Sequence, residues 1–519
     1  MRKLNRFIFS RYFFCALMIL LSIAMLFSII FWAYNYSVYI YMFMMLLSAI
    51  TSLNIINKET NPEFKLPWMM IVTVIPIFGM LIYFLFYSRR LTRKEARLMT
   101  KIYNKYDDAI ESDSRSRAIF SENMAALESE DSLASGKARA ICFDDYGADV
   151  YRGTSSRYYP LGEELFEAML ADLSTARKYI FLEYFIVEQG EMWDRMLAVL
   201  KEKVREGVDV RLLYDDIGSM YTLPSSFPDK LSKFGIKCQR FGKIIPRVST
   251  VHHNRDHRKI CVIDGEIAYT GGVNIADEYI NKKKRFGHWK DGGIRVEGHA
   301  ALGFLKLFIT MWDFTEGSVS NYISLFDFKT PKTEGDGGYY IPLSSGPAPT
   351  YPACVGENAI LNLINQSKNY IYITTPYLII DYALTEALKN AARRGVEVII
   401  VTPGKADKKL VKLMTKSFYP QLVSSGVKIY EYAPGFMHEK LIVSDDIYAM
   451  IGTINMDYRS LVHHYEDALW MYKSPTVLKI KEEFLKTLSV CEQITEKNAK
   501  LSFSQKVTKD LIRIFAPLL

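Results

Sequence analysis

One short pattern of residues occurs twice in the chain, and its repetition constrains the fold more than any other feature. Each copy reads His-x-Lys-x4-Asp and is followed by a glycine-containing turn that ends in asparagine. The first copy comprises His257, Lys259, Asp264 and Asn274, and the second comprises His438, Lys440, Asp445 and Asn455. Because the spacing and the tail both recur, the pattern indicates duplication of a whole structural unit rather than a chance match.

The segments that precede the two motifs also resemble each other. Residues 176–214 and 367–401 each contain an apolar run, a helical pattern that ends at Gly207 or Gly395, and a second apolar run. Strands buried on both faces need nearly continuous apolar sequence, and a glycine in the left-handed conformation commonly ends a helix. We therefore predict two β-α-β units in an α/β fold. Its two tandem domains have mixed central sheets flanked by helices and are related by a pseudo-twofold duplication.

The residue types of the motif suit chemistry at phosphorus. Imidazole can attack phosphorus or donate a proton near neutral pH, and Lys and Asn side chains can hold phosphate oxygens. His and Lys two residues apart on a strand project from the same face, whereas Asp264 and Asp445 are predicted to point to the opposite face. The candidate catalytic residues are therefore the His, Lys and Asp of both motif copies. For the two Asp residues, a structural role is favoured over a catalytic one.

Three uncharged apolar runs, residues 13–32, 38–56 and 66–87, occupy the N-terminal part of the chain. Each is long enough to cross a bilayer as a helix, and a cleaved signal peptide is disfavoured because two more runs follow the first. We predict a membrane anchor with two to three transmembrane helices. The basic cluster between Arg89 and Lys105 favours a cytoplasmic location for the domains that follow, and the number of crossings stays open.

The cysteines, histidines and net charge of the chain indicate which cofactors and partners to expect. The six cysteines are scattered without paired spacing, which indicates reduced core residues rather than a disulfide framework or a zinc site. The adjacent His252 and His253 are interpreted as part of a polar loop, because neighbouring side chains on a strand point apart. We expect no metal. The net charge of +8 suits an anionic membrane surface or an anionic substrate, with nucleic acid as an alternative.

Several strings around the motifs resemble the phospholipase D superfamily, and within it the bacterial cardiolipin synthases. They are RDHRKICVIDG, YTGGVNIADEYI, GHWKDGG, LLYDDIGS, TPYLIIDYALTEAL, HEKLIVSD and IGTINMDYRS. The resemblance covers roughly residues 60–519. It implies tandem phospholipase D-like domains. The expected division is a membrane anchor over 1–90, a helical linker over 91–145, the two domains over 146–335 and 336–495, and an amphipathic C-terminal helix over 496–519.

The resemblance implies a cardiolipin synthase reaction that needs no cofactor. One motif histidine attacks phosphatidylglycerol to form a phosphohistidine, glycerol leaves, and a second phosphatidylglycerol accepts the phosphatidyl group to give cardiolipin. Family precedent favours His257 as nucleophile and His438 as acid and base, although the sequence itself does not distinguish them. The residues expected to hold the phosphate oxygens are Lys259, Lys440, Asn274, Asn455 and Thr453. Asp291 in the first half and Glu466 in the second are expected to orient the imidazoles.

Some residues depart from the family pattern and leave the acceptor open. Lys290 stands in place of the usual Arg, and Leu461 and His464 replace a Phe and an Asn before Glu466. A phosphatidyltransferase or hydrolase with a different alcohol acceptor is therefore the first alternative. A nuclease is disfavoured by the apolar runs, and a non-catalytic scaffold by the two complete motifs. The expected partners are phosphatidylglycerol and the cell membrane of a bacterium, without nucleic acid; the oligomeric state is not predicted.

Overall fold

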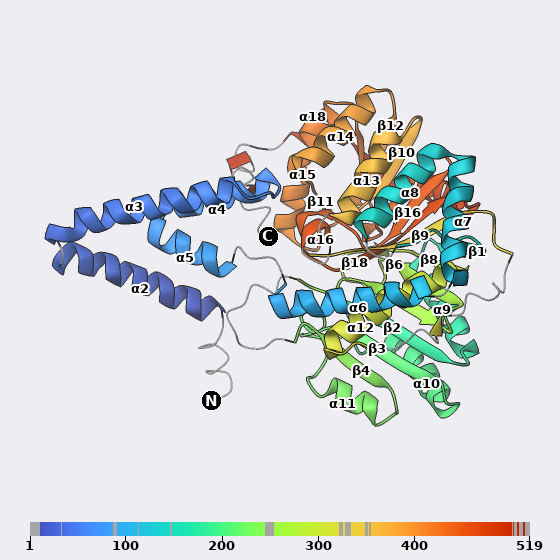
Figure 1. The fold of residues 1–519 in the computed structure, drawn as a ribbon. Helices are drawn as coiled ribbons and strands as arrows, with labels where there is room; N and C mark the ends of the chain where they lie inside the picture. Colours follow the sequence, from blue (N-terminus) through green and yellow to red (C-terminus); the bar gives the residue numbers. More distant parts are fainter. Residues whose placement is uncertain are drawn as a thin grey trace. The chain divides into compact units, whose positions relative to one another are not determined.

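In the computed structural model the chain divides into two compact units (Figure 1). The described residues are 11–32, 34–86, 91–112, 114–145, 148–243, 254–320, 325–326, 334–347, 351, 354–500, 502, 506–507 and 512–513. The first unit comprises Met1–Arg90, Ile244–His253 and Val507–Leu519. The second comprises Leu91–Lys243 and Asn254–Lys506, and it holds both copies of the motif.

Apolar helices make up the described part of the first unit. They are α2 (Arg11–Trp32), α3 (Tyr34–Ile56), α4 (Pro62–Val74) and α5 (Pro76–Phe86). Among the described residues, one stretch, Val38–Ile56 in α3, is long and apolar enough to cross a membrane. Leu17–Ser28 and Pro76–Leu85 are apolar but shorter. A small cluster that includes Trp68 and Tyr83 packs α3, α4 and α5 against one another.

The expectation that residues 66–87 form one membrane-length helix is wrong. The run is divided at Ile75, and Pro76 begins the next helix, because proline lacks the amide hydrogen that would continue the first one. With 13 and 11 residues, α4 and α5 are about 20 and 17 Å long, which is less than the roughly 30 Å of a bilayer core. The first two runs form longer helices of 22 and 23 residues.

The first half of the second unit is built on a seven-stranded sheet. Its strands are β1 (Thr154–Tyr159), β2 (Tyr179–Tyr184), β3 (Asp209–Asp215), β4 (Lys237–Phe241), β5 (Lys259–Ile263), β6 (Ile267–Gly271) and β8 (Gly293–Gly298). They lie in the order β1-β8-β6-β5-β2-β3-β4, with β2, β3 and β4 parallel and the other pairs antiparallel. Apolar side chains of α9 (Gly162–Thr175), α10 (Glu191–Arg205) and α11 (Phe227–Ser232) cover one face, and α12 (Ala300–Glu316) covers the other.

The second half repeats this sheet and adds one edge strand. Its strands are β9 (Tyr339–Ser345), β10 (Tyr370–Thr374), β12 (Glu397–Pro403), β13 (Lys428–Tyr432), β15 (Leu441–Ser444), β16 (Tyr448–Gly452), β18 (Glu466–Tyr472) and β19 (Cys491–Ile494). Their order, β9-β18-β16-β15-β10-β12-β13-β19, matches the first sheet position by position up to β13. The helices around it are α13 (Val355–Gln366), α14 (Tyr382–Arg393), α15 (Lys409–Val423), α16 (Tyr458–Val462) and α17 (Thr476–Leu488).

Both predicted β-α-β crossovers are present, and the prediction of two tandem α/β domains is confirmed. α10 connects the parallel pair β2 and β3, and α14 connects the parallel pair β10 and β12. Gly207 and Gly395 follow these helices with φ of +90°, a conformation that L side chains rarely adopt. The duplication read from the motifs therefore extends through the whole fold of each half.

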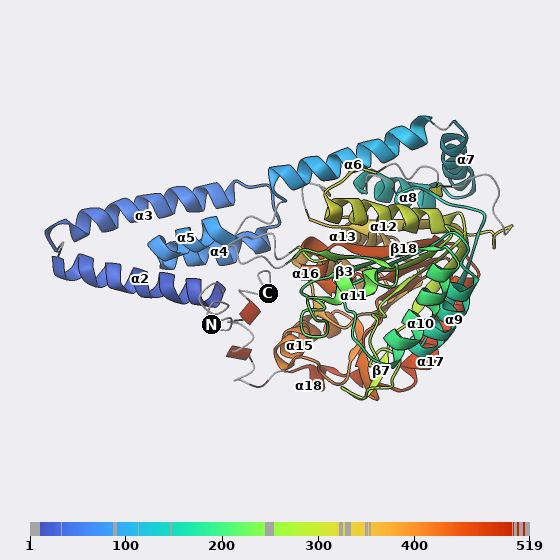
Figure 2. The same ribbon diagram turned by 90° about the horizontal axis from the view of Figure 1, so that it is seen from below.

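Two short stretches of parallel pairing join the halves. β7 (His288–Lys290) pairs with β14 (Gly435–Met437), and Asp256 forms an isolated bridge with Tyr465. A separate small pair, β11 (Leu378–Ile379) with β17 (Met456–Asp457), lies within the second half. α12 packs against β9 as well as the first sheet, so its apolar side chains lie in a core shared by both halves. Figure 2 shows the layers, with α12 and α13 on one side of the sheets and α9, α10 and α17 on the other.

The segment predicted as a helical linker is part of the second unit. Its helices are α6 (Arg93–Ser112), α7 (Ser114–Glu130) and α8 (Ser132–Asp144). α6 contacts α12, and its Tyr103 hydroxyl lies 2.5 Å from the hydroxyl of Tyr351. The predicted C-terminal helix lies largely outside the described residues, which include α18 (Glu496–Ala499) and a few positions beyond it. His252 and His253 also lie outside the described residues.

Candidate active site

The backbone pairing between the halves brings each motif histidine to an acid of the other half. The amide of His257 donates to the carbonyl of Tyr465, the residue before Glu466, at 2.9 Å. The amide of His438 likewise donates, at 2.8 Å, to the carbonyl of the residue before Asp291. Because the backbones are paired at these points, the side chains that follow meet across the junction. From the sequence, Asp291 was expected to serve the first half and Glu466 the second. Nothing in the sequence signals that each acid holds the histidine of the other half.

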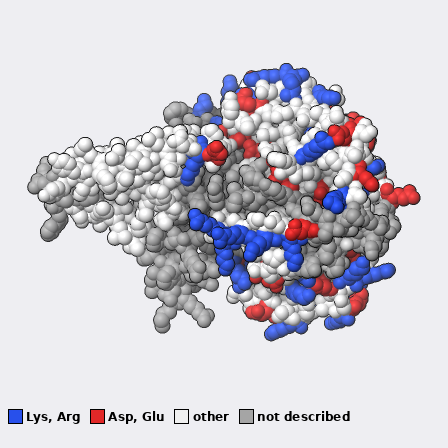
Figure 3. Space-filling view, in the orientation of Figure 1, with Lys and Arg blue, Asp and Glu red and all other residues white. Residues whose placement is uncertain are grey.

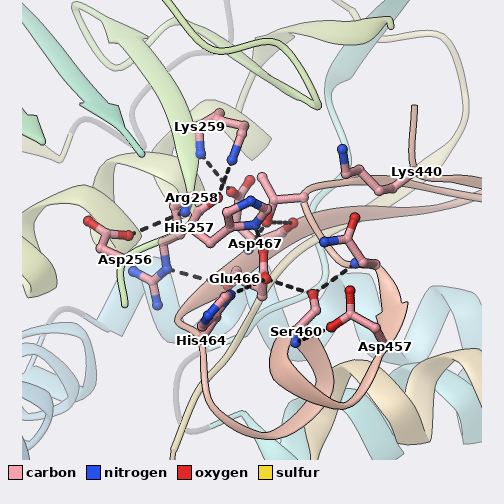
Figure 4. A network of polar contacts seen from close by, with 12 residues as sticks. Asp256, His257, Arg258, Lys259, Lys440, Asp457, Ser460, His464, Glu466 and Asp467 are labelled. Atoms are coloured by element: carbon pink, nitrogen blue, oxygen red, sulfur yellow. Dashed lines mark hydrogen bonds and ion pairs between the residues drawn. The ribbon is translucent and has the colours of Figure 1, made fainter. Parts of the chain in front are cut away.

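The His257 imidazole is held by Glu466. Its Nδ1 lies 2.8 Å from Glu466 Oε2, and both side chains are buried (Figure 4). Burial lowers the pKa of His257 to about 3, against the opposing effect of the carboxylate. Burial alone would raise the pKa of Glu466, but the neighbouring imidazole holds it below its ordinary value. The ring is therefore neutral at pH 7, and the bond to Glu466 places its proton on Nδ1 and leaves the Nε2 lone pair for reaction.

The His438 imidazole is held in the same way by Asp291. Its Nδ1 lies 2.6 Å from Asp291 Oδ2. Three aromatic rings surround it at centroid distances of 5.4 to 5.8 Å: Tyr279, Trp289 and Phe436. Burial lowers the pKa of His438 to about 4, with Lys440 acting in the same direction and Asp291 against it. Both motif histidines are thus buried, neutral and fixed in the same tautomer.

The motif lysines lie beside the histidines that they follow. Lys259 Nζ donates to the His257 carbonyl at 2.6 Å, and Lys440 Nζ donates to the His438 carbonyl and lies 2.9 Å from His438 Nδ1. Because that nitrogen directs its proton to Asp291, the ammonium acts on it electrostatically. Burial lowers the pKa of Lys259 to about 8 and that of Lys440 to about 7. An anion between them would favour the protonated form of both.

The two motif asparagines differ in how far their side chains are already engaged. The Asn274 carboxamide accepts from the Ile186 amide at 3.0 Å and donates to the Tyr279 hydroxyl at 2.7 Å. The carboxamide oxygen of Asn455 is buried and has no hydrogen-bond partner within the described part of the chain. Asn455 is therefore the less committed of the two toward a ligand.

Thr453, predicted to contact phosphate, has its hydroxyl engaged elsewhere. It donates to the carbonyl of Asp467 at 3.1 Å and accepts from the amide of the same residue at 2.9 Å. The side chain is fully buried in the pairing of β16 with β18. Thr453 thus fixes the backbone next to Glu466, and its contact with phosphate stays a prediction.

The motif aspartates end the strands that carry the motifs and lie away from the imidazoles. Asp264 accepts hydrogen bonds of 2.7 to 2.8 Å from the backbone amides of Arg177, Lys178 and Tyr179. Asp445 accepts bonds of 2.8 to 3.0 Å from those of Lys368, Asn369 and Tyr370. Both have φ of +54°. These contacts agree with the structural role favoured from the sequence, and a catalytic role for either aspartate stays a prediction.

Further buried polar residues support the site without having been predicted. The Ser460 hydroxyl donates to Glu466 Oε1 at 2.6 Å, and Arg258 Nε donates to the Glu466 carbonyl at 3.3 Å. Asp467 accepts from the backbone amide of Lys259 at 3.2 Å. Ser460 ends the string IGTINMDYRS and Arg258 lies in the string RDHRKICVIDG, but neither residue was given a role. Asp467 directly follows Glu466 and lies outside the recognised strings.

His464, known from the sequence only as a departure from the family pattern, lies next to the first imidazole–carboxylate pair. Its ring centroid is 5.5 Å from that of His257, and its Nδ1 is 3.6 Å from Glu466 Oε1. His257, His464 and Glu466 offer ligand atoms that all lie within 4.8 Å of one another. These are the residues of the described site whose spacing is compatible with a metal ion.

Comparison with protein families matches both halves of the chain. Residues 169–284 and 360–488 match the family described as cardiolipin synthase, PLD-like domain. Residues 46–86 match the family described as phospholipase D-nuclease N-terminal. Each of the two segments matched by the first family contains one copy of the His-x-Lys motif.

Curated relatives align over nearly the whole chain. A cardiolipin synthase of Halalkalibacterium halodurans is 30% identical over 464 residues, with 89% of this chain and 90% of the relative covered. A cardiolipin synthase of Staphylococcus aureus is 31% identical over 484 residues, with 91% and 94% covered. An uncharacterized protein of Streptococcus mutans is 38% identical over 487 residues, with 90% and 99% covered.

Among solved structures, the crystal structure of a phosphatidylserine synthase from Haemophilus influenzae shares the fold, with a TM-score of 0.56 and 14% identity over 74% of this chain and 98% of that one. The family match includes both motifs, and the aligned cardiolipin synthases span about nine tenths of the chain. The chain therefore belongs to the cardiolipin synthase family of the phospholipase D superfamily and is an enzyme of the phosphatidyltransferase class.

Proposed function

We propose that this enzyme is a cardiolipin synthase, which transfers a phosphatidyl group from one phosphatidylglycerol to another and releases glycerol. One observation carries the proposal: two neutral imidazoles from different halves enter one site, each with Nδ1 held by a buried carboxylate. Such a pair provides a nucleophile and an acid without nucleotide or metal. The cardiolipin synthase relatives support cardiolipin as the product.

In the first step, Nε2 of His257 attacks the phosphorus of the donor lipid. The P–N bond forms as the bond from phosphorus to the glycerol oxygen breaks, and that oxygen takes a proton from the imidazolium of His438. The phosphorylated ring keeps its Nδ1 proton and carries a positive charge, which the Glu466 carboxylate offsets. Free His438 is neutral at pH 7, so the negative charge of the bound phosphate must favour its protonation.

In the second step, neutral His438 accepts the proton of a hydroxyl on the second phosphatidylglycerol. The resulting oxygen attacks phosphorus, the P–N bond breaks, and His257 returns to its neutral form. The phosphodiester bond energy is conserved because one such bond replaces another. The ammonium groups of Lys259 and Lys440 and the carboxamides of Asn274 and Asn455 would hold the non-bridging oxygens during both steps.

The surroundings of the two rings favour His257 as nucleophile. Glu466 is fixed by Ser460 in addition to the imidazole, and a fixed carboxylate stabilises a ring that stays charged for the lifetime of the intermediate. This contact from a buried hydroxyl agrees with the family precedent for His257 as nucleophile.

We further propose a membrane location with the second unit on the cytoplasmic side. In α6, four exposed basic side chains recur at intervals of four residues, so they share one face of the helix: Arg93, Arg97, Lys101 and Lys105. We call this face the α6 ridge; Figure 3 shows Lys and Arg side chains in a row along α6. The opposite face of the helix is buried through Met99, Ile102 and Tyr103. A basic surface soon after apolar helices suits the anionic inner leaflet.

The proposal is tested with purified protein in vesicles whose only reactive lipid is phosphatidylglycerol. We expect cardiolipin and free glycerol in equal amounts. The second candidate, transfer to another alcohol, is favoured by Leu461 and His464 beside the site, where the family pattern has other residues. Appearance of product only after addition of a second alcohol would support that candidate. Phosphatidic acid as the sole product would indicate a hydrolase.

A further inference from the structure

His464 lies beside the first imidazole–carboxylate pair and has no part in the transfer reaction. It adds a second imidazole next to the carboxylate that holds His257. We infer that His257, His464 and Glu466 form a binding site for a divalent transition-metal ion such as Zn²⁺, and that the bound ion inhibits the enzyme. The inhibition, though not the binding, rests on the proposed role of His257.

The three ligand atoms lie close enough together to converge on one tetrahedral ion after small movements of the side chains. Zn²⁺ binds imidazole nitrogen and carboxylate oxygen at about 2.0–2.2 Å, and tetrahedral angles then separate neighbouring ligand atoms by about 3.4 Å. His257 Nδ1 lies 2.8 Å from Glu466 Oε2, and His464 Nδ1 lies 3.6 Å from Glu466 Oε1. All three ligand atoms lie within 4.8 Å of one another. Two imidazoles and one carboxylate leave a fourth position for water, the ligand set of many zinc sites.

The contacts around the three residues hold them in place. Glu466 is oriented by the Ser460 hydroxyl at 2.6 Å, and the amide of His464 donates to the carbonyl of Arg459 at 3.0 Å. Figure 4 shows Glu466 between the rings of His257 and His464. Within the described residues, Nδ1 of His464 is buried and makes no hydrogen bond, and the group nearest to it among the proposed ligands is Glu466, at 3.6 Å. Outer contacts of this kind orient metal ligands and raise affinity.

An ion in this position would stop phosphatidyl transfer by removing what His257 needs for attack. On Nδ1 it would replace the proton that links the ring to Glu466, and the carboxylate would no longer offset the charge of the phosphohistidine. On Nε2 it would occupy the lone pair that attacks phosphorus. In both cases the ion competes with the reaction at the nucleophile, and a chelator should restore activity.

Binding is measured first, because it does not depend on the proposed reaction. Purified full-length protein is freed of metal with a chelator and titrated with Zn²⁺ in equilibrium dialysis. We expect one site in the wild type that His464→Asn weakens by tenfold or more, since the loss of a ligand exceeds the roughly 10–100-fold effect of an outer contact. His288→Asn is the matched control, because His288 contacts Tyr432 and lies outside the cluster. Mg²⁺, which prefers oxygen ligands, should not compete.

Inhibition is then measured for each variant relative to its own activity in chelator. Zn²⁺ should inhibit the wild type and His288→Asn, with recovery on addition of EDTA, and should inhibit His464→Asn only at concentrations at least tenfold higher. Absence of the site in the wild type, or equal affinity of the wild type and His464→Asn, would overturn the metal site. Binding that requires His464 but leaves transfer unchanged would overturn the inhibition alone. A protein that binds Zn²⁺ in this way but makes no cardiolipin would refute the proposed function and leave the site standing.

Discussion

His257 Nδ1 lies 2.8 Å from Glu466 Oε2, although the two residues belong to different copies of the duplicated unit. His438 and Asp291 form the reciprocal pair at 2.6 Å. Each half therefore supplies a histidine to one pair and an acid to the other, and neither half completes an imidazole–carboxylate pair alone. Duplication has produced one site with two different pairs rather than two equivalent sites.

The exchange of acids makes each carboxylate essential to the ring it holds. Asp291→Asn and Glu466→Gln keep the size of the side chain but remove the charge that fixes the Nδ1 proton. We expect each to lower kcat for cardiolipin formation by about 10²–10⁴. Thermal unfolding of both variants serves as the control for folding. Activity within threefold of the wild type in a folded variant would contradict the orienting role.

The motif aspartates should matter for stability and not for chemistry. Asp264→Ala removes three backbone acceptor contacts and leaves alanine at φ of +54°. We expect a loss of about 2–3 kcal/mol in the free energy of unfolding. Asp264→Asn, which keeps an acceptor and tolerates positive φ, should lose less. Chemical denaturation measures both, and kcat per folded molecule should stay near the wild-type value. A large fall in kcat with unchanged stability would support a catalytic role.

The rate at low substrate concentration should fall as pH rises through neutrality. Burial lowers the pKa of Lys440 to about 7 and that of Lys259 to about 8 in the free enzyme. The ammonium form, which holds phosphate, exists below these values and is lost above them. We therefore expect kcat/KM to decline above pH 7. Lys440→Arg keeps its charge to far higher pH. In this variant, the decline of kcat/KM that begins near pH 7 should be absent, even if the absolute rate is lower. A pH profile identical to that of the wild type would contradict the assignment of this decline to Lys440.

Removal of charges from the α6 ridge should weaken membrane binding without altering the site. Arg97→Gln with Lys101→Gln is expected to lower binding to phosphatidylglycerol vesicles by about tenfold or more, since each basic residue near an anionic surface contributes about 1 kcal/mol. Lys230→Gln with Lys233→Gln is a control of equal charge on and beside α11. Vesicle flotation at low salt measures the difference. Equal binding by the two double variants would argue against the ridge as the docking surface.

The duplicated α/β architecture and the histidine and lysine pairs were predictable because they depend on local patterns. Apolar runs, Gly207 and Gly395 mark the crossovers, and the motif spacing marks the site. The pairing of His257 with Glu466 was not predictable, because it depends on a bridge between Asp256 and Tyr465 that no local pattern encodes.

Two other differences have local physical causes that residue type alone did not reveal. The hydroxyl of Thr453 could contact phosphate or backbone equally well by its chemistry, and in the structure it hydrogen-bonds to the backbone of Asp467. The third apolar run has the composition of a membrane helix, but Pro76 divides it. The apolar character of the run and the position of Thr453 in the motif were both read correctly from the sequence. The geometry of the neighbouring backbone then determined how long the helices are and what the hydroxyl contacts.

The central claim, covalent transfer through His257 in a site shared by both halves, is tested most directly by trapping the intermediate. Wild-type protein is incubated briefly with phosphatidylglycerol labelled in the phosphate, quenched in base to preserve a phosphoramidate, and digested for mass spectrometry. We predict that the label resides on the peptide that contains His257 and that it is absent from His257→Ala protein. Label on the peptide that contains His438 in wild-type protein, with none on His257, would contradict the account.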